Sequence, residues 1–182
     1  MSPYLSFRPN SPDDLALYAS LFRNEDWLYN SGFQREDFQT DEQLRYFMEC
    51  HHPAELKGIV YETESGRIIG IAHFKHVGEN DLEFIGGVRP ELLNSGLGLL
   101  GSVVALDQAF RSRTFGVMRA IIYQQNSRSA RIDQKMGFRK SGRIVQYDVR
   151  LFDEYVLTRE GFYGNEFNRS FLRRNGLLCE EI

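Results

Sequence analysis

The sequence predicts one domain of the mixed α/β class, with an antiparallel first half and a βαβ unit in the second half. Its 182 residues are 42% hydrophobic and 26% charged, which is typical of a globular domain. The hydrophobic period changes from helical to alternating near Lys57, and both periods recur after it. No repeat or Pro/Gly/Ser linker divides the chain, so we expect a single core.

The N-terminal part is predicted to hold a strand and two helices. Leu5–Pro9 is a short strand. A capping Ser11, followed by proline and two acidic residues, predicts a helix that runs to about Phe22. Residues 24–39 are aromatic and are expected to be irregular. A capping box that begins at Thr40 then predicts a second helix.

A β-hairpin and a third strand are predicted next. Residues 58–62 and 67–74 are rich in Ile and Val and flank a turn at residues 64–66. Residues 82–88 form the third strand. The paired glycines 86 and 87 inside it predict either a bulge or the close approach of another molecule.

The second half alternates helices and strands. We expect a long apolar helix over 96–111, a strand over 118–123, a helix over 127–136, strands over 142–150 and 154–158, and a tail helix over 165–175. Gly137 occupies the position of a C-cap glycine. Phe167, Phe171 and Leu172 share one face of the tail helix.

Composition and charge exclude several classes of protein. The longest uncharged stretch, residues 92–106, is shorter than the roughly 20 apolar residues of a membrane helix, and the start lacks a signal-peptide pattern. Two cysteines fit a reducing compartment, and we expect a cytoplasmic protein. We also expect a monomer or homodimer without a membrane partner. The net charge of −3 argues against a nucleic-acid partner. The acidic excess before residue 80 fits a cationic ligand, and the basic excess after it fits a phosphate-bearing one; ordinary solvated faces are the alternative.

The strongest local signal is the run LNSGLGLLG, from Leu93 to Gly101, which leads into a helix. A glycine-containing loop at a helix N-terminus presents unpaired N–H groups and binds phosphate or pyrophosphate. The run also matches G-x-G-x-x-G. However, Pro90 separates it from the preceding strand, and residues 121–126 hold no acidic ribose ligand, so a nicotinamide site is disfavoured. Close packing of the helix on the sheet is the structural alternative.

Taken together, these residues resemble the GNAT superfamily of acetyl-CoA-dependent N-acetyltransferases, over roughly residues 4–160. The loop LNSGLG at 93–98 is similar to the family's Q/R-x-x-G-x-G/A pyrophosphate loop. Asn126-x-x-Ser129 with KMGF at 135–138 is similar to its N-x-x-S/A…K-x-G-F segment. The opening FRP at 7–9 resembles the usual first strand, and the branch most similar to this chain acetylates ribosomal proteins and small amines.

The resemblance implies a fold, a co-substrate and a reaction. The fold is a central, mostly antiparallel twisted sheet with a βαβ cofactor-binding unit and helices on both faces. A single N-acetyltransferase domain would cover residues 1–160, and 161–182 would pack on it. Acetyl-CoA would donate its acetyl group to a primary amine of a small molecule, an amino sugar or a protein N-terminus. The residues expected to bind the cofactor are Gly87, Val88, Asn94, Ser95, Gly96, Leu97, Gly98, Asn126, Arg128 and Lys135. Those expected to contact the acceptor are Trp27, Tyr29 and Phe33.

The resemblance also implies catalytic roles. Glu83 is expected to act as the base and Ser129 as the acid that protonates the departing thiolate. Two positions depart from the family pattern: Leu93 replaces Gln or Arg, and Asp133 stands where a tyrosine acid is usual. Other residues weighed as bases or acids are His73, His76, Tyr123 and Tyr147. The run Cys50-His51-His52 lacks a fourth ligand at a familiar spacing, so no metal site is predicted.

Two other functions remain open. Leu93 and Asp133 are compatible with a non-catalytic acyl-CoA-binding module of the same fold. An enzyme that acetylates aminoacyl-tRNA is the third possibility, and the net negative charge argues against it.

Overall fold

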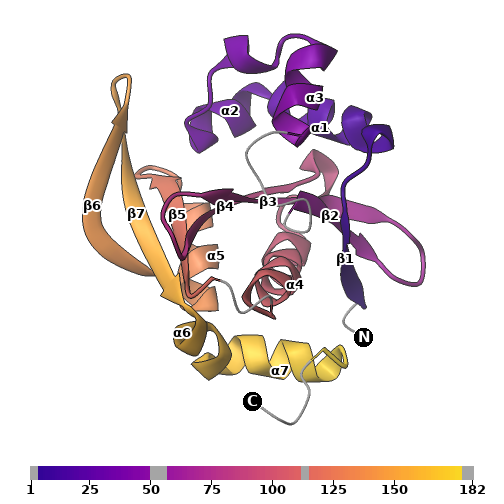
Figure 1. Ribbon diagram of the computed structural model, residues 1–182, viewed down its shortest axis with the longest axis vertical. Helices are drawn as coiled ribbons and strands as arrows, with labels where there is room; N and C mark the ends of the chain where they lie inside the picture. Colours follow the sequence, from indigo (N-terminus) through magenta and orange to yellow (C-terminus); the bar gives the residue numbers. More distant parts are fainter. Residues whose placement is uncertain (1–3, 50–56, 112–114, 178–182) are drawn as a thin grey trace.

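A seven-stranded sheet separates two layers of helices in the computed structural model, which describes residues 4–49, 57–111 and 115–177 (Figure 1). The strands are β1 (Leu5–Pro9), β2 (Lys57–Glu62), β3 (Ile68–His76), β4 (Asp81–Val88), β5 (Val117–Tyr123), β6 (Arg139–Tyr147) and β7 (Arg150–Thr158). Their order is β1-β2-β3-β4-β5-β7-β6, and only β4 and β5 run parallel. The predicted mixed α/β class, antiparallel first half and βαβ unit are confirmed.

Helices cover both faces of the sheet, as predicted. The elements α1 (Leu15–Phe22), α2 (Glu25–Ser31) and α3 (Asp41–Glu49) lie on one face (Figure 1). The elements α4 (Leu97–Arg111), α5 (Ser127–Met136), α6 (Arg159–Gly164) and α7 (Glu166–Arg174) lie on the other. Each layer buries its own apolar cluster, and Ile59 of β2 and Ile71 of β3 face the first.

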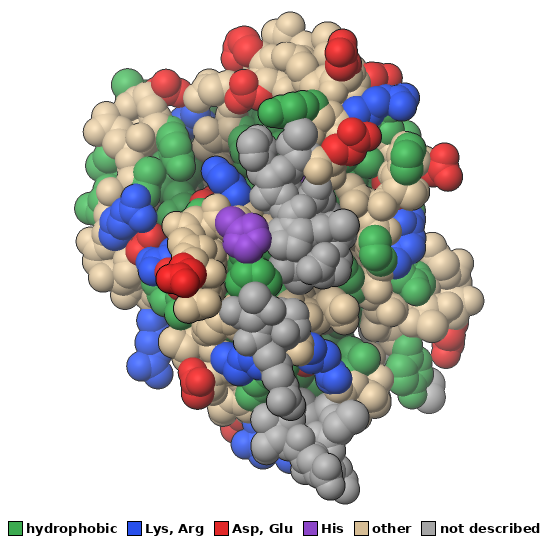
Figure 2. Space-filling model, viewed as in Figure 1, with side chains coloured by type: hydrophobic (Ala, Val, Ile, Leu, Met, Phe, Trp, Pro, Cys, Tyr) green, Lys and Arg blue, Asp and Glu red, His purple; other side chains and the backbone are tan. Residues whose placement is uncertain are grey.

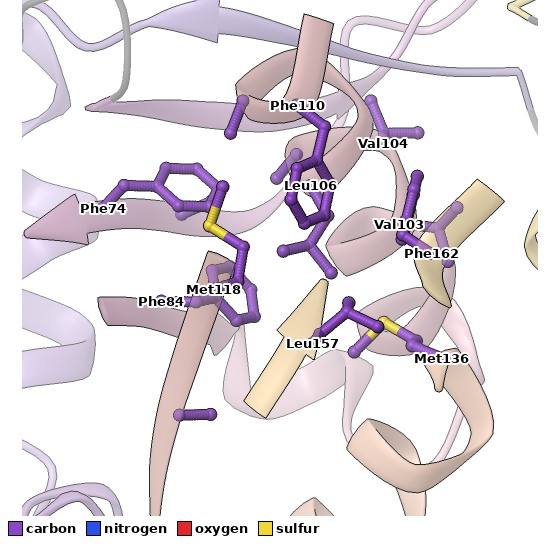
Figure 3. Packing of buried hydrophobic residues seen from close by; sticks show 14 of the residues in the cluster. Phe74, Phe84, Val103, Val104, Leu106, Phe110, Met118, Met136, Leu157 and Phe162 are labelled. Atoms are coloured by element: carbon purple, nitrogen blue, oxygen red, sulfur yellow. The ribbon is translucent and has the colours of Figure 1, made fainter. Parts of the chain in front are cut away.

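The larger cluster packs α4 against the middle of the sheet (Figure 3). Phe74, Phe84 and Met118 come from β3, β4 and β5 and meet Leu106 and Phe110 of α4. Complete burial of a side chain of this size stabilises the fold by roughly 1.5–3 kcal/mol. The C-terminal segment contributes to this core through α6 and α7, whose buried residues include Phe162, Phe171 and Leu172.

The sheet is split between its two parallel strands. β4 and β5 pair only where Asp81, Leu82 and Glu83 lie beside residues 117–119. Both strands continue beyond this short ladder, β4 to Val88 and β5 to Tyr123, without further pairing to each other. The backbone groups that face this gap therefore have no strand partner. This opening positions the site described below.

The expectation of an irregular segment over residues 24–39 is wrong. It contains α2 and a 3-10 turn at Arg35–Phe38. The Oδ1 atom of Asn24 accepts a hydrogen bond from the N–H of Trp27 at 2.9 Å and caps α2, and Gly32 ends the helix with φ of 81°. A good cap and a C-terminal glycine allow a short helix among aromatic residues that disfavour one.

The last hairpin turns earlier than predicted. β6 ends at Tyr147 and β7 begins at Arg150, so residues 148 and 149 form the turn, and Asp148 adopts φ of 54°. Aspartate tolerates this left-handed conformation, so the turn has no glycine to mark it. The short helix α6 was also not predicted from the sequence. The bulge proposed at glycines 86 and 87 is absent, because β3 and β4 pair there without a register shift.

Candidate active site

A large cavity opens where β4 and β5 diverge. Its volume is about 1570 Å³, whereas pockets for one small ligand typically measure about 300–1,000 Å³. The walls come from the C-terminal halves of β4 and β5, the first turns of α4 and α5, and the layer of α2 and α3. The cavity thus reaches from one helical layer to the other and is large enough for two reactants.

The backbone of β4 forms one edge of the opening. The N–H of Arg89, just after β4, donates to the carbonyl of Ile69 in β3 at 2.9 Å. Backbone direction alternates along a strand, so Gly87 points its N–H and C=O at β3, whereas Gly86 and Val88 point theirs into the gap. Gly86, Gly87 and Val88 all line the cavity. Two residues of this strand were predicted to bind the cofactor. Val88 has backbone N–H and C=O groups that point into the gap, whereas Gly87 lines the cavity but points its backbone groups at β3.

The predicted phosphate loop leads into α4 in a turn with two left-handed residues, Asn94 at φ of 65° and Gly96 at φ of 82°. The hydroxyl of Ser95 accepts a hydrogen bond from the N–H of Leu97 at 3.2 Å. The next N–H groups of the first helical turn have no partner inside the helix. Gly98 lines the cavity, as do Leu93, Gly101 and Ser102, whereas residues 94–97 do not. The N-terminus of α4 therefore lies beside the cavity, and helix N-termini of this kind are suited to anions.

The N-terminus of α5 forms the opposite edge. The Oδ1 atom of Asn126 accepts a hydrogen bond from the N–H of Ser129 at 3.1 Å, so this residue caps the helix. Asn126, Arg128 and Ser129, which were predicted to contact the cofactor or the departing sulfur, line the cavity. Lys135 is not part of the cavity wall; its Nζ lies 4.5 Å from the centre of the Phe167 ring on α7.

Glu83 lies at the end of the short β4–β5 ladder and faces the cavity. Burial raises the pKa of its carboxyl above the usual value, and the charges of Lys75 and Arg143 oppose this rise. A carboxylate whose pKa is raised towards neutrality is a better proton acceptor than an ordinary glutamate. Glu83 therefore has the position and the electrostatics that a general base needs.

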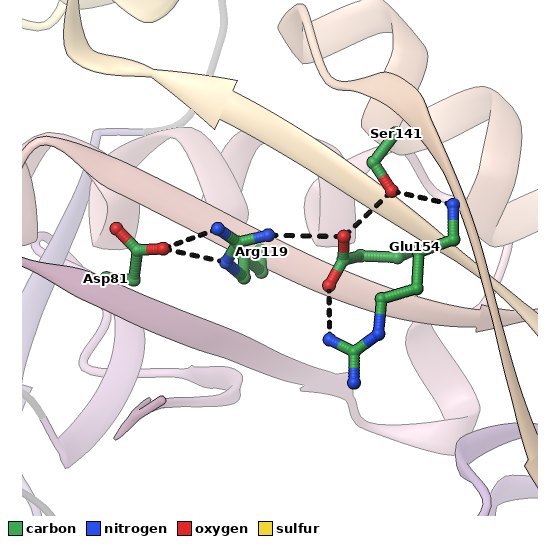
Figure 4. Close-up of polar contacts among 5 residues, drawn as sticks. Asp81, Arg119, Ser141 and Glu154 are labelled. Atoms are coloured by element: carbon green, nitrogen blue, oxygen red, sulfur yellow. Dashed lines mark hydrogen bonds and ion pairs between the residues drawn. The ribbon is translucent and has the colours of Figure 1, made fainter. Parts of the chain in front are cut away.

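An ion network anchors the strands around this carboxylate (Figure 4). The guanidinium of Arg119 on β5 binds Asp81 at 2.5 Å and the buried Glu154 of β7 at 3.1 Å. Glu154 also accepts hydrogen bonds from Ser141 at 2.7 Å and from Arg143 at 3.0 Å. Burial acts to raise the pKa of Glu154, but these partners together hold it below its usual value. Nothing in the sequence pattern indicated this network, because its members come from four strands.

The far wall of the cavity is aromatic and acidic. Trp27 and Phe33 stack with ring centres 5.7 Å apart, and both line the cavity. The Nε1 atom of Trp27 lies 3.1 Å from the point that a Cβ on Gly87 would occupy, so the indole packs on the C-terminal end of β4. Acidic side chains gather over α1–α3 at the top of the space-filling view (Figure 2). Those that line the cavity from this layer are Asp26, Asp37 and Glu42.

Of the other candidate residues, Tyr147 lines the cavity and the rest lie away from it. Tyr29, expected at the acceptor site, instead hydrogen-bonds Tyr123 at 3.1 Å, and neither lines the cavity. His73 is completely buried and hydrogen-bonds Tyr18 within the core. The ring of His76 contacts Phe115. Tyr147 does line the cavity, where burial raises its pKa.

Within residues 4–49, 57–111 and 115–177, the His, Cys, Asp and Glu side chains form no cluster of three or more suited to a metal ion. Residues 50–52 lie outside the described part. No described helix is both long and apolar enough to cross a membrane.

The fold is shared with solved acetyltransferases. A spermidine N-acetyltransferase from Vibrio cholerae, in complex with CoA and spermine, superimposes with a TM-score of 0.76 at 15% identity, over 87% of this chain and 98% of that one. A GNAT-family acetyltransferase from Bacillus anthracis gives 0.70 at 20% identity, over 88% and 98%. An aminoglycoside acetyltransferase in complex with coenzyme A gives 0.70 at 16% identity, over 88% and 98%. No curated protein sequence matches the chain significantly.

The sequence also matches one family directly. Residues 5–139 match the acetyltransferase (GNAT) domain. This stretch contains the diverging strands, the loop that leads into α4, and α5 with its capping asparagine. The chain therefore belongs to the acetyltransferase (GNAT) domain family and is an acyltransferase.

Proposed function

We propose that the protein transfers the acetyl group of acetyl-CoA to a primary amine of a small molecule that carries more than one positive charge. One observation carries the proposal: a single cavity joins a helix N-terminus suited to phosphates, an opening between two strands, and an acidic wall. An anionic donor bound at the helix N-terminus and a cationic acceptor bound at the acidic wall would meet beside Glu83.

The chain's own groups fit the donor, whose thioester supplies the activated acetyl group. The first N–H groups of α4, with the loop at 94–98, would hold the pyrophosphate. The free backbone groups of Gly86 and Val88 would hydrogen-bond the amide-containing arm as an added strand would. Asn126 uses Oδ1 to cap α5, which leaves its Nδ2 as a donor to the same arm. The cation of Arg128 would face the remaining phosphate.

The acceptor would enter from the opposite side. Trp27 and Phe33 would enclose its carbon chain, and Asp26, Asp37 and Glu42 would hold its additional ammonium groups. Glu83 would take the proton that the attacking amine must lose, directly or through one water. Ser129 would hydrogen-bond the departing sulfur from α5. Two of the similar structures hold spermine and kanamycin, which are amines of this multiply charged kind.

The test combines binding with turnover. Calorimetry with acetyl-CoA, CoA and NAD should show binding of the first two only. Thiol release should then be at least about tenfold faster, in kcat/KM, with spermidine or kanamycin than with butylamine or a peptide with a free N-terminus. A double variant, Asp37→Asn with Glu42→Gln, should lose this preference without losing CoA affinity.

The possible failures are distinct. CoA binding without thiol release for any amine would favour a non-catalytic acyl-CoA-binding module. Equal rates for butylamine and spermidine would refute the multiply charged acceptor. Absence of CoA binding would refute the whole proposal.

A further inference from the structure

Asp133 on α5 is a buried acid with no partner. It is 8% exposed and lines the cavity. Among the residues that the structure describes, none forms a hydrogen bond or ion pair with its carboxyl group, and burial accounts for the shift of its pKa. Buried carboxylates in proteins are almost always paired, because removal of a charge from water is costly.

The position is unfavourable for a charged carboxylate on two further grounds. Asp133 lies in the last turn of α5, where the helix dipole disfavours a negative charge. The shift of its pKa is caused by burial, with no contribution from a neighbouring charge, so no cation compensates for a carboxylate at this position. An acid that weakens the fold in three ways is better explained by function than by stability.

Burial alone raises the pKa of Asp133 to about 7. Ionisable side chains that line the same cavity are Asp26, Asp37, Glu42, Tyr46, Lys75, Glu83, Arg128 and Tyr147. None of them alters this pKa, so the carboxyl responds to desolvation only. Asp133 is thus an acid that carries a proton up to neutral pH and faces the reaction space.

We infer that Asp133 is the proton donor to the sulfur atom that leaves during acetyl transfer. It lies one helical turn after Ser129 and two turns after Asn126, so all three share the face of α5 that lines the cavity. The inference rests on the proposed function. It separates two roles on α5: Ser129 hydrogen-bonds the sulfur, whereas Asp133 loses a proton.

The step balances as follows. The amine nitrogen uses its lone pair to form a bond to the acetyl carbon, and the carbon–sulfur bond breaks with its electrons on sulfur. Asp133 gives its proton to that sulfur and becomes a carboxylate. The proton lost from the amine nitrogen passes to Glu83, which releases it to solvent, and a proton from solvent returns to Asp133. The products are the acetylated amine and the free thiol.

The test compares Asp133→Asn, which keeps the shape of the side chain, with Ser129→Ala. Positioned acids typically contribute about 10²–10⁴-fold to rates. Asp133→Asn should therefore lower kcat about 100-fold, leave the Kd for CoA within twofold, and abolish the fall of kcat on the alkaline side of the pH profile. Ser129→Ala should lower kcat but keep that alkaline fall.

A second measurement applies even if the variant does not fold. Carbon-13 NMR of the unliganded wild-type protein should show the Asp133 carboxyl titrating near neutrality. Titration below about pH 5 would overturn the inference. It would also fail if Asp133→Asn kept kcat within threefold of wild type, or kept the alkaline fall. Failure of the wild-type protein to bind CoA would instead refute the proposed function.

Discussion

A pair of substitutions at Gly96 separates the charge at the phosphate loop from its backbone strain. Gly96 has φ of 82°, and a Cβ placed there would meet no atom within 4 Å. Asparagine and aspartate have the same shape, and both tolerate this conformation better than other residues. Each should therefore destabilise the fold by only about 1 kcal/mol, which lowers Tm by roughly 2–4 °C in a chain of this length.

The two variants should differ strongly in CoA binding. Two unit charges of the same sign at about 4 Å repel by about 1 kcal/mol in water and about 4 kcal/mol near a protein surface. Gly96→Asp, which places a carboxylate beside the pyrophosphate, should raise the Kd for CoA at least about tenfold over Gly96→Asn. A carboxylate at a helix N-terminus is itself stabilising, so unfolding would not explain the loss.

Isothermal calorimetry at two salt concentrations is the appropriate assay. The difference between the variants should narrow from 0.1 M to 1 M salt, because the screening length falls from about 10 Å to about 3 Å. Equal Kd values for the two variants at low salt would refute the assignment of this loop to the phosphates.

Three other predictions concern ionisable groups around the cavity. Because burial raises the pKa of Glu83, its basic form is lost as pH falls towards that pKa. Glu83→Gln should lower kcat and remove the fall of kcat on the acid side of its pH profile. An unchanged profile would exclude Glu83 as the base. The pKa of Asp133 is higher in the folded state than in the unfolded state. The free energy of unfolding of the wild-type protein therefore falls as pH rises from about 4 to about 7. Urea denaturation should show Asp133→Asn gaining up to roughly 4 kcal/mol at pH 8 and less at pH 5, since each pKa unit is worth about 1.4 kcal/mol, whereas a pH-independent difference would contradict burial as the cause. Arg119→Ala should lower the free energy of unfolding by about 3 kcal/mol in the same assay, because Glu154 stays buried with fewer partners. The control Arg139→Ala, at an exposed position, should change it by less than about 0.5 kcal/mol. Equal effects would mean that the network contributes nothing to stability.

The sequence alone determined the parts of the site that depend on neighbouring residues. A helix N-terminus is formed by consecutive residues, so the loop at 93–98 and the cap at Asn126 were recognisable from their glycines and their hydrogen-bonding side chain. The order of the strands and the longer helices followed from hydrophobic periodicity for the same reason, whereas the short helices α2 and α6 were not predicted. The final turn at residues 148 and 149 was misplaced because it has no glycine or proline signal.

Only the tertiary structure decided where the two halves of the site meet. The length over which β4 pairs with β5 sets the opening, and no property of either strand by itself specifies that length. Arg119 reaches Asp81 and Glu154 across separations of 38 and 35 residues. The pKa of Asp133 depends on how completely the folded chain removes it from water. Desolvation and long-range charge pairing arise from packing between distant segments, whereas periodicity and capping are local properties of the chain.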